Sequence, residues 1–143
     1  MAAVLRDRSS ERSAEEIDAL VRHPNPHLRA NVVGDPSTPL TPAQVNTLVD
    51  DASPSVRAHV LRSGRDLSAS QVRRLAADPS ELVRIAVISS RHPLPRSVVS
   101  RLVVDPHDRV RSALARSARP LTAADRAALA ADAHWDVRRS LAS

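Results

Sequence analysis

The 143-residue sequence has no cysteine, lysine, phenylalanine or tyrosine, and it contains one tryptophan and two glycines. Without cysteine, disulfides, thiolate chemistry and iron–sulfur clusters are excluded. Because the only glycines are Gly34 and Gly64, the chain lacks a glycine-rich loop that could hold a phosphate. No apolar run approaches the roughly 20 residues of a membrane span. We therefore predict a cytoplasmic protein that does not associate with membranes.

All 21 basic residues are arginine, and the formal net charge is +5. The depleted residue types have AT-rich codons, whereas arginine and alanine have GC-rich ones. This bias predicts a bacterial genome of high GC content and weakens any argument from the choice of arginine over lysine. The net charge itself remains a pointer to an acidic partner.

One six-residue interval recurs along the chain. An acidic residue stands six places before an arginine that follows valine, and consecutive copies are 27 residues apart. The full copies are Asp51 with Arg57, Asp78 with Arg84, Asp105 with Arg111, and Asp132 with Arg138. A degenerate copy, His23 with Arg29, stands 28 residues before the first. Such a fixed period is typical of a solenoid, in which each unit buries its apolar face against its neighbours.

Each repeat is predicted to contain two short helices. The first begins at a capping signal such as Thr41-Pro42-Ala43-Gln44, which has threonine at the N-cap and glutamine at N3. A proline-bearing turn such as Asp78-Pro79 then ends it. We therefore predict an all-α fold of about five two-helix repeats, over residues 13–39, 40–66, 67–93, 94–120 and 121–143. Residues 1–12 are predicted to be an N-terminal extension.

These residues resemble the leucine-rich repeat variant family and, more distantly, HEAT repeats. The stretch Leu75-Ala76-Ala77-Asp78-Pro79, followed by Val83-Arg84-Ile85-Ala86-Val87, is similar to the family's repeat, and the resemblance covers residues 13–143. It implies a right-handed α-solenoid that serves as a binding scaffold. In HEAT-like repeats the Asp and Arg of this interval form a structural ladder between successive units, and this implies the same role for the four pairs given above. The cysteine cluster of some variant-repeat proteins has no counterpart here.

Helical geometry offers a test of whether the ladder arginines form a basic stripe for a ligand. With about 100° per residue, each arginine lies about 100° from the first aliphatic residue of the second helix. It falls between two apolar arcs, one that includes Val83 and Val87 and one marked by Ile88. This placement favours an arginine that points along the stack towards a neighbouring aspartate and turn carbonyls. Ligand binding by the same arginines stays open as the alternative.

The remaining arc of the second helices is predicted to face outward, and it is not repeated. Its apolar centre is Leu82 and Ile85, and arginines surround that centre. The predicted partner-binding residues are Arg62, Leu82, Ile85, Arg109, Arg116, Arg139 and Trp135. Arg119, in a following loop, is expected to add positive charge at one end of these helices. The alternative is an ordinary solvated face with two incidental aliphatic residues.

Trp135 is the only aromatic residue and lies in the last turn. Two roles are open: it covers the end of the stack, or it anchors a partner. We favour the first, because tryptophan buries a large area. The last repeat also leaves an apolar edge that a second copy of the chain, or a subunit of a larger complex, could cover.

No set of residues indicates catalysis, a cofactor or a metal. His107 and His134 occupy equivalent places in adjacent repeats, but no histidine pair has metal-ligand spacing on a helix. We therefore predict a non-enzymatic scaffold for protein–protein interaction that binds through the outward face of the second helices. The alternative is nucleic-acid binding, with clustered arginines contacting the phosphate backbone.

Overall fold

The computed structural model describes residues 12–142, and over this range it contains ten α-helices and no strand. The predicted extension, residues 1–12, lies outside the described residues except for Arg12. The all-helical class is thus confirmed, and the fold is compatible with an α-helical repeat protein. None of the described helices is long and apolar enough to cross a membrane.

The chain divides into two compact units, Met1–Ser63 and Gly64–Ser143. The helices of the first unit are α1 (Ala14–Val21), α2 (Pro26–Gly34), α3 (Pro42–Val49) and α4 (Pro54–Arg62). Those of the second unit are α5 (Ala69–Ala76), α6 (Glu81–Ser89), α7 (Arg96–Val103), α8 (Asp108–Arg116), α9 (Ala123–Ala130) and α10 (Trp135–Leu141).

Capping signals in the sequence set the starts of the first helices. Capping boxes open four of them, formed by Ser13 with Glu16, Thr41 with Gln44, Ser68 with Gln71, and Thr122 with Asp125. In each box the N-cap hydroxyl accepts the N3 backbone N–H while the N3 side chain accepts the N-cap N–H. α7 begins instead after Pro95, which makes no side-chain capping bond.

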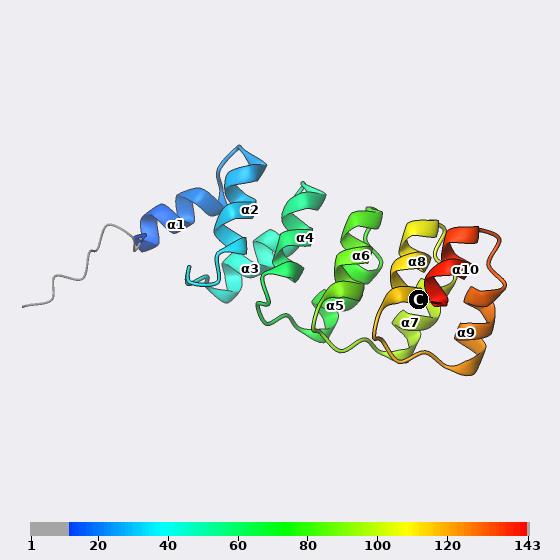
Figure 1. Ribbon diagram of the computed structural model, residues 1–143. Coiled ribbons are helices and arrows are strands. Elements are labelled where there is room, and N and C mark those ends of the chain that lie inside the picture. Colours follow the sequence, from blue (N-terminus) through cyan, green and yellow to red (C-terminus); the bar gives the residue numbers. More distant parts are fainter. Residues whose placement is uncertain (1–11, 143) are drawn as a thin grey trace, which may run out of the picture. The chain divides into compact units, whose positions relative to one another are not determined.

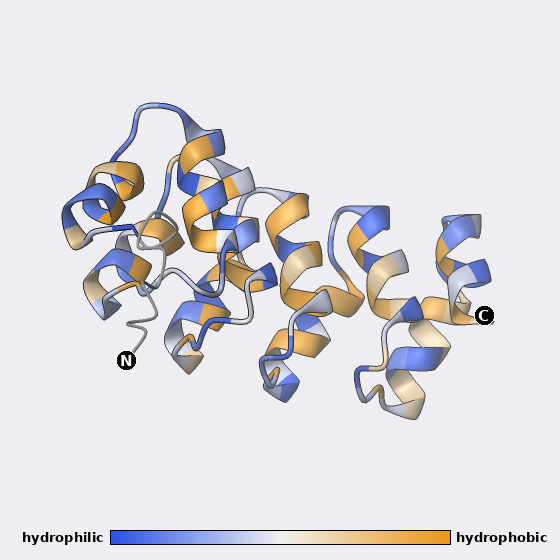
Figure 2. Ribbon diagram, turned by 60° about the vertical axis from the view of Figure 1, so that its left-hand side comes forward, coloured by the Kyte–Doolittle hydropathy of each residue, from blue (hydrophilic) through white to orange (hydrophobic). Residues whose placement is uncertain are grey.

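Packing between helices supplies the stability that these helices lack alone. Each has only seven to nine residues, too few to be stable in water without tertiary contacts. In the second unit α5, α7 and α9 form one row, and α6, α8 and α10 form another (Figure 1). Apolar residues gather where the two rows face each other (Figure 2). The core of this unit contains Ile88, Val98, Val99, Leu102, Val103, Val110, Leu114, Leu129 and Val137.

The first unit is built in the same way from α1 to α4. α2 packs along α4, and each of these two helices also contacts the first helix of its own repeat. The core residues are Ile17, Val21, Ala30, Val32, Val33, Leu48, Val49, Val56, Ala58, Val60 and Leu61, all at most 4% exposed.

Candidate functional site

Ladder arginines bind the aspartate of the following repeat in a two-pronged ion pair. Arg84 on α6 places Nε 2.8 Å from Oδ2 of Asp105 and Nη2 3.0 Å from Oδ1. Arg111 on α8 meets Asp132 in the same way at 2.7 and 3.1 Å, and Arg29 on α2 meets Asp51 at 2.8 and 2.9 Å. The planar guanidinium matches a carboxylate in this geometry, which makes the contact strong and directional.

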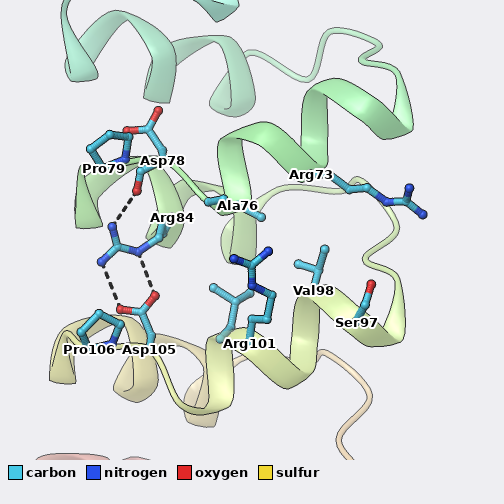
Figure 3. A pocket seen from close by; sticks show the side chains of 12 residues that line it. Arg73, Ala76, Asp78, Pro79, Arg84, Ser97, Val98, Arg101, Asp105 and Pro106 are labelled. Carbon is cyan, nitrogen blue, oxygen red and sulfur yellow. Dashed lines mark hydrogen bonds and ion pairs between the residues drawn. The ribbon is translucent and has the colours of Figure 1, made fainter.

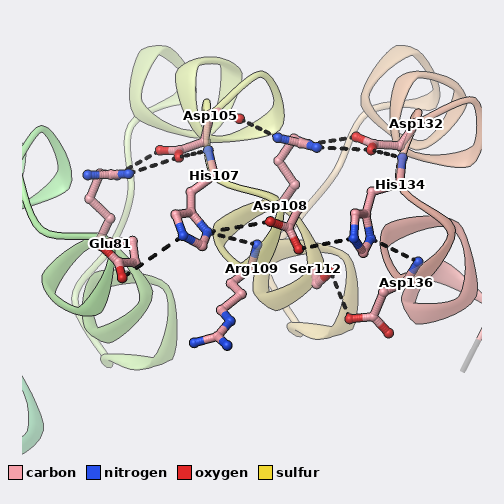
Figure 4. Close-up of polar contacts among 11 residues, drawn as sticks. Glu81, Asp105, His107, Asp108, Arg109, Ser112, Asp132, His134 and Asp136 are labelled. Atoms are coloured by element: carbon pink, nitrogen blue, oxygen red, sulfur yellow. Dashed lines mark hydrogen bonds and ion pairs between the residues drawn. The ribbon is translucent and has the colours of Figure 1, made fainter.

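Each partner in these pairs has a second bond that holds it in place. Arg84 Nη1 donates to the backbone carbonyl of Asp78, six residues earlier, and Arg111 donates likewise to Asp105. The Asp105 carboxylate also accepts the backbone N–H of His107 at 2.9 Å. Figure 4 shows this pattern repeated at Asp132.

The burial of these paired arginines argues against a role for them in ligand binding. The paired side chains of Arg29, Arg84 and Arg111 are only 12–16% exposed. The aspartate bond raises the pKa of Arg111, and the same bond lowers the pKa of the Asp132 carboxyl. At the other two ladder positions, Arg57 and Arg138 each donate to the carbonyl six residues earlier, and the Asp78 carboxylate accepts the backbone N–H of Ser80.

Most of the middle row of the predicted outward strip does not face solvent, although Arg139 in this row is exposed. Ala30 and Ser112 are buried, and Ile85 is partly buried against the core of the second unit. Ile85 is therefore less exposed than expected, and its role in binding a partner stays a prediction. The second helices of adjacent repeats pack side by side, so this row faces the next helix. For example, Ser112 Oγ on α8 lies 3.5 Å from Asp136 Oδ2 on α10.

The outer rows of the strip are exposed. Leu82 on α6 is 38% exposed and Trp135 on α10 is 58% exposed. The arginines predicted in these rows, Arg62, Arg109 and Arg116, are also exposed, as is Arg139 in the middle row. The expectation that Trp135 covers the end of the stack is wrong. Its ring instead stacks on His134, with centroids 6.1 Å apart and an angle of 21° between the ring planes.

A row of histidines and carboxylates joins the starts of α6, α8 and α10 (Figure 4). His107 and His134 are N-caps, and each Nδ1 accepts a backbone N–H two residues later. The Nε2 atoms then face carboxylates, Glu81 at 4.0 Å and Asp108 at 3.5 Å. The 27-residue spacing of the two histidines was visible in the sequence, but their capping role was not predicted. Within residues 12–142 no group of three such side chains could hold a metal ion.

A groove lies between α5 and α7 on the side of the first helices. It has a volume of about 420 Å³, and Ala76, Val98 and Leu102 form its apolar lining. The Arg84–Asp105 pair stands at one end (Figure 3). Sequence reasoning missed this groove, because the spacing of residues along one helix does not show how two first helices pack.

Arg119 is partly buried and bonded to backbone carbonyls, whereas the sequence led us to expect a displayed charge at the end of the second helices. Its guanidinium donates to the carbonyls of Val87, Ile88, Ser90 and His92, which lie at and beyond the end of α6. Burial lowers the pKa of Arg119. This side chain therefore serves as a cap for the α6 terminus and is not available to a partner.

These contacts define two exposed surfaces in the second unit, the outer rows of the second helices and the groove between the first helices. No known protein family, curated protein or solved structure matches this chain. The chemistry of the exposed side chains is therefore what indicates a function.

One further ion pair, between Arg96 on α7 and Asp125 on α9, makes stability depend on pH. Arg96 Nη2 lies 2.5 Å from Asp125 Oδ1, and Asp125 Oδ2 accepts the backbone N–H of Thr122. The arginine bond first, and the Thr122 bonds with it, lower the pKa of Asp125 from 3.8 to about 2. A lowered carboxyl pKa stabilises the fold above pH 4, and that stabilisation is lost as the pH falls from about 4 to 2.

We therefore expect Asp125→Asn to be less stable than the wild type at pH 7, with the gap narrowing from pH 4 to pH 2. Asparagine keeps an acceptor for the Thr122 N–H but loses the charge that pairs with Arg96. Urea unfolding of both proteins at pH 7, 4, 3 and 2 measures the gap. A gap that is the same at pH 2 and pH 7 contradicts the assigned role of the Asp125 charge.

Proposed function

We propose that this chain is a protein-binding module built as a right-handed α-solenoid with a period of 27 residues. The helix starts support the period, since α5, α7 and α9 begin at Ala69, Arg96 and Ala123, each 27 residues apart. The Arg–Asp contacts between successive repeats, and the resemblance to the leucine-rich repeat variant and HEAT-like repeats, support the solenoid.

The observation that carries the proposal is the exposure of two large apolar side chains on the second helices. Leu82 on α6 and Trp135 on α10 are 38% and 58% exposed, and α8 lies between these helices with Arg109 exposed in the same row as Leu82. Tryptophan and arginine are the residues that most often dominate binding energy at interfaces. Exposed apolar side chains among charged ones are typical of a surface that another protein covers.

Capture experiments with a matched control test this surface. Wild-type protein and Leu82→Ser/Trp135→Ser are immobilised, and proteins captured from a lysate of the native host are quantified by mass spectrometry. We expect the double variant to lose the specific partner by at least about tenfold, since each anchor contributes roughly 1–2 kcal/mol. Urea unfolding should show a small change only, because both side chains are exposed.

Val104→Ser is the control for general stickiness, because Val104 is 73% exposed in the turn after α7. Retention of every wild-type partner by the double variant contradicts the proposed surface. If the double variant and Val104→Ser lose captured proteins to the same extent, capture depends on exposed apolar area alone.

Nucleic-acid binding is a second candidate, favoured by unpaired charge on the first helices of the second unit. Arg73 on α5, Arg101 on α7 and Arg126 on α9 are exposed, and none has a hydrogen bond or ion pair from its side chain to another described residue. Phosphate contacts by such residues weaken steeply with salt. A titration with duplex DNA at low and physiological salt tests this candidate, and an absence of binding at low salt removes it.

A further inference from the structure

We propose that the groove between α5 and α7 binds an acidic segment of a partner protein, with a carboxylate held by Arg73 and Arg101. The inference rests on the proposed protein-binding function and gives it a second surface, on the first helices instead of the second. Three observations carry it: the charges that line the groove, its apolar lining and its size.

The charges lining the groove are committed to internal contacts except for two. Arg84 is bound to Asp105 and to the Asp78 carbonyl. The Asp105 carboxylate takes both the Arg84 fork and the His107 N–H, and the Asp78 carboxylate accepts the Ser80 N–H. The charge in the groove that remains available to a ligand is therefore positive.

Arg73 and Arg101 supply this positive charge. Both line the groove, both are exposed, and neither side chain has a partner among residues 12–142. In Figure 3 Arg101 extends from α7 towards Ala76 on α5, while Arg73 extends outward from α5 at the end of the groove away from Arg84. A guanidinium binds a carboxylate through two parallel hydrogen bonds, and it is more weakly hydrated than an ammonium group.

The apolar lining indicates what the rest of the ligand contains. Ala76, Val98 and Leu102 lie on α5 and α7, and Pro79 and Pro106 come from the two turns that follow these helices. An aliphatic side chain of the ligand can contact them while a neighbouring carboxylate binds the arginines. In an extended segment, side chains two residues apart point to the same side, which allows this alternation. A volume of about 420 Å³ holds a few side chains.

The same lining favours a protein segment over nucleic acid. No aromatic side chain lines the groove, so it offers no surface for base stacking. The backbone of DNA also presents charged phosphates and polar sugars, and no branched aliphatic side chain to place against Val98 and Leu102. Duplex DNA is therefore an alternative occupant that the experiment has to exclude.

The test uses the full chain and two fluorescein-labelled peptides, one of alternating glutamate and valine and one of alternating glutamine and valine. Fluorescence anisotropy measures their affinities. We expect the glutamate peptide to bind at least tenfold more tightly than the glutamine peptide at low salt, and its binding to weaken with added salt. Arg73→Gln/Arg101→Gln should reduce its affinity at least tenfold, with an unchanged urea unfolding curve because both side chains are exposed.

Two control variants separate this inference from the proposed function. Arg109→Gln/Arg116→Gln removes the same charge from the second helices, and it should bind the peptide at least threefold more tightly than Arg73→Gln/Arg101→Gln. Leu82→Ser/Trp135→Ser should bind it as the wild type does, even if it loses its cellular partner. The inference is overturned if the glutamate peptide does not bind, if the glutamine peptide binds equally well, or if the Arg73/Arg101 variant keeps full affinity. Preferential binding of duplex DNA at these two arginines overturns it in favour of nucleic acid.

Discussion

Replacing Asp105 with alanine is expected to lower the free energy of unfolding by about 3 kcal/mol. Its side chain is 6% exposed, and Arg84, which it binds through two hydrogen bonds, is 12% exposed. Removing one partner of a buried pair leaves the other charge without compensation, which costs roughly 3–5 kcal/mol when burial is complete. We expect the low end of this energy range because Arg84 keeps its bond to the Asp78 carbonyl. Urea unfolding at neutral pH measures the loss.

The chain contains a matched control for this substitution. Arg22 and Asp18 form an ion pair on α1 at 3.3 Å, but their side chains are 76% and 50% exposed. Exposed pairs contribute about 0–1 kcal/mol, so Asp18→Ala should change stability by less than about 0.5 kcal/mol. Similar costs for Asp105→Ala and Asp18→Ala would contradict the role of burial. A double-mutant cycle with Arg84→Met isolates the pair itself.

Replacing Arg119 with alanine is expected to cost about 2–4 kcal/mol. The guanidinium bonds to four backbone carbonyls around the end of α6, with distances from 2.5 Å at Ser90 to 3.1 Å at Val87. Alanine would remove a donor from each of these carbonyls, although Val87 still accepts the N–H and hydroxyl of Ser90. An unsatisfied buried polar group costs roughly 1–3 kcal/mol. We expect hydrogen exchange at the end of α6 to quicken more than elsewhere, because this terminus loses its cap.

Arg119→Lys distinguishes geometry from charge. Lysine keeps the positive charge but has no planar fork, so it cannot reach four carbonyls at once. It should recover less than half of the stability lost in Arg119→Ala. Full recovery by lysine would show that charge near the helix end is sufficient, as expected from the helix dipole alone.

Local chemistry made much of the fold predictable from the sequence. Capping pairs such as Thr41 with Gln44 act within a single turn, so their pattern identifies the helix start directly. Prolines such as Pro79 end the preceding helix by a steric effect on the residue before them. The direction of the ladder arginines also followed from helical angles, because apolar residues flank them on both sides.

The features that the sequence did not predict depend on how separate helices meet. The angle of Ile85 on α6 was predicted from the sequence, but its partial burial also depends on the neighbouring helix α8. Arg119 reaches carbonyls 27–32 residues away, and Arg96 reaches Asp125 across 29 residues. Neither of these long-range contacts has a recognisable pattern in the sequence. Trp135 was expected to cover the end of the stack because tryptophan buries a large area at a terminus, with anchoring of a partner kept open; its 58% exposure leaves the second role.

The direction of the Arg–Asp link has a consequence for how the chain could change in length. Each link runs from one repeat forward to the next, as from Arg84 to Asp105 and from Arg111 to Asp132. If residues 94–120 were deleted, Arg84 would face Asp132, a chemically identical partner at the same register. Loss of this 27-residue segment would thus preserve the Arg–Asp link between second helices at the new junction. Unequal recombination between repeats could lengthen or shorten such a protein and still keep this link intact.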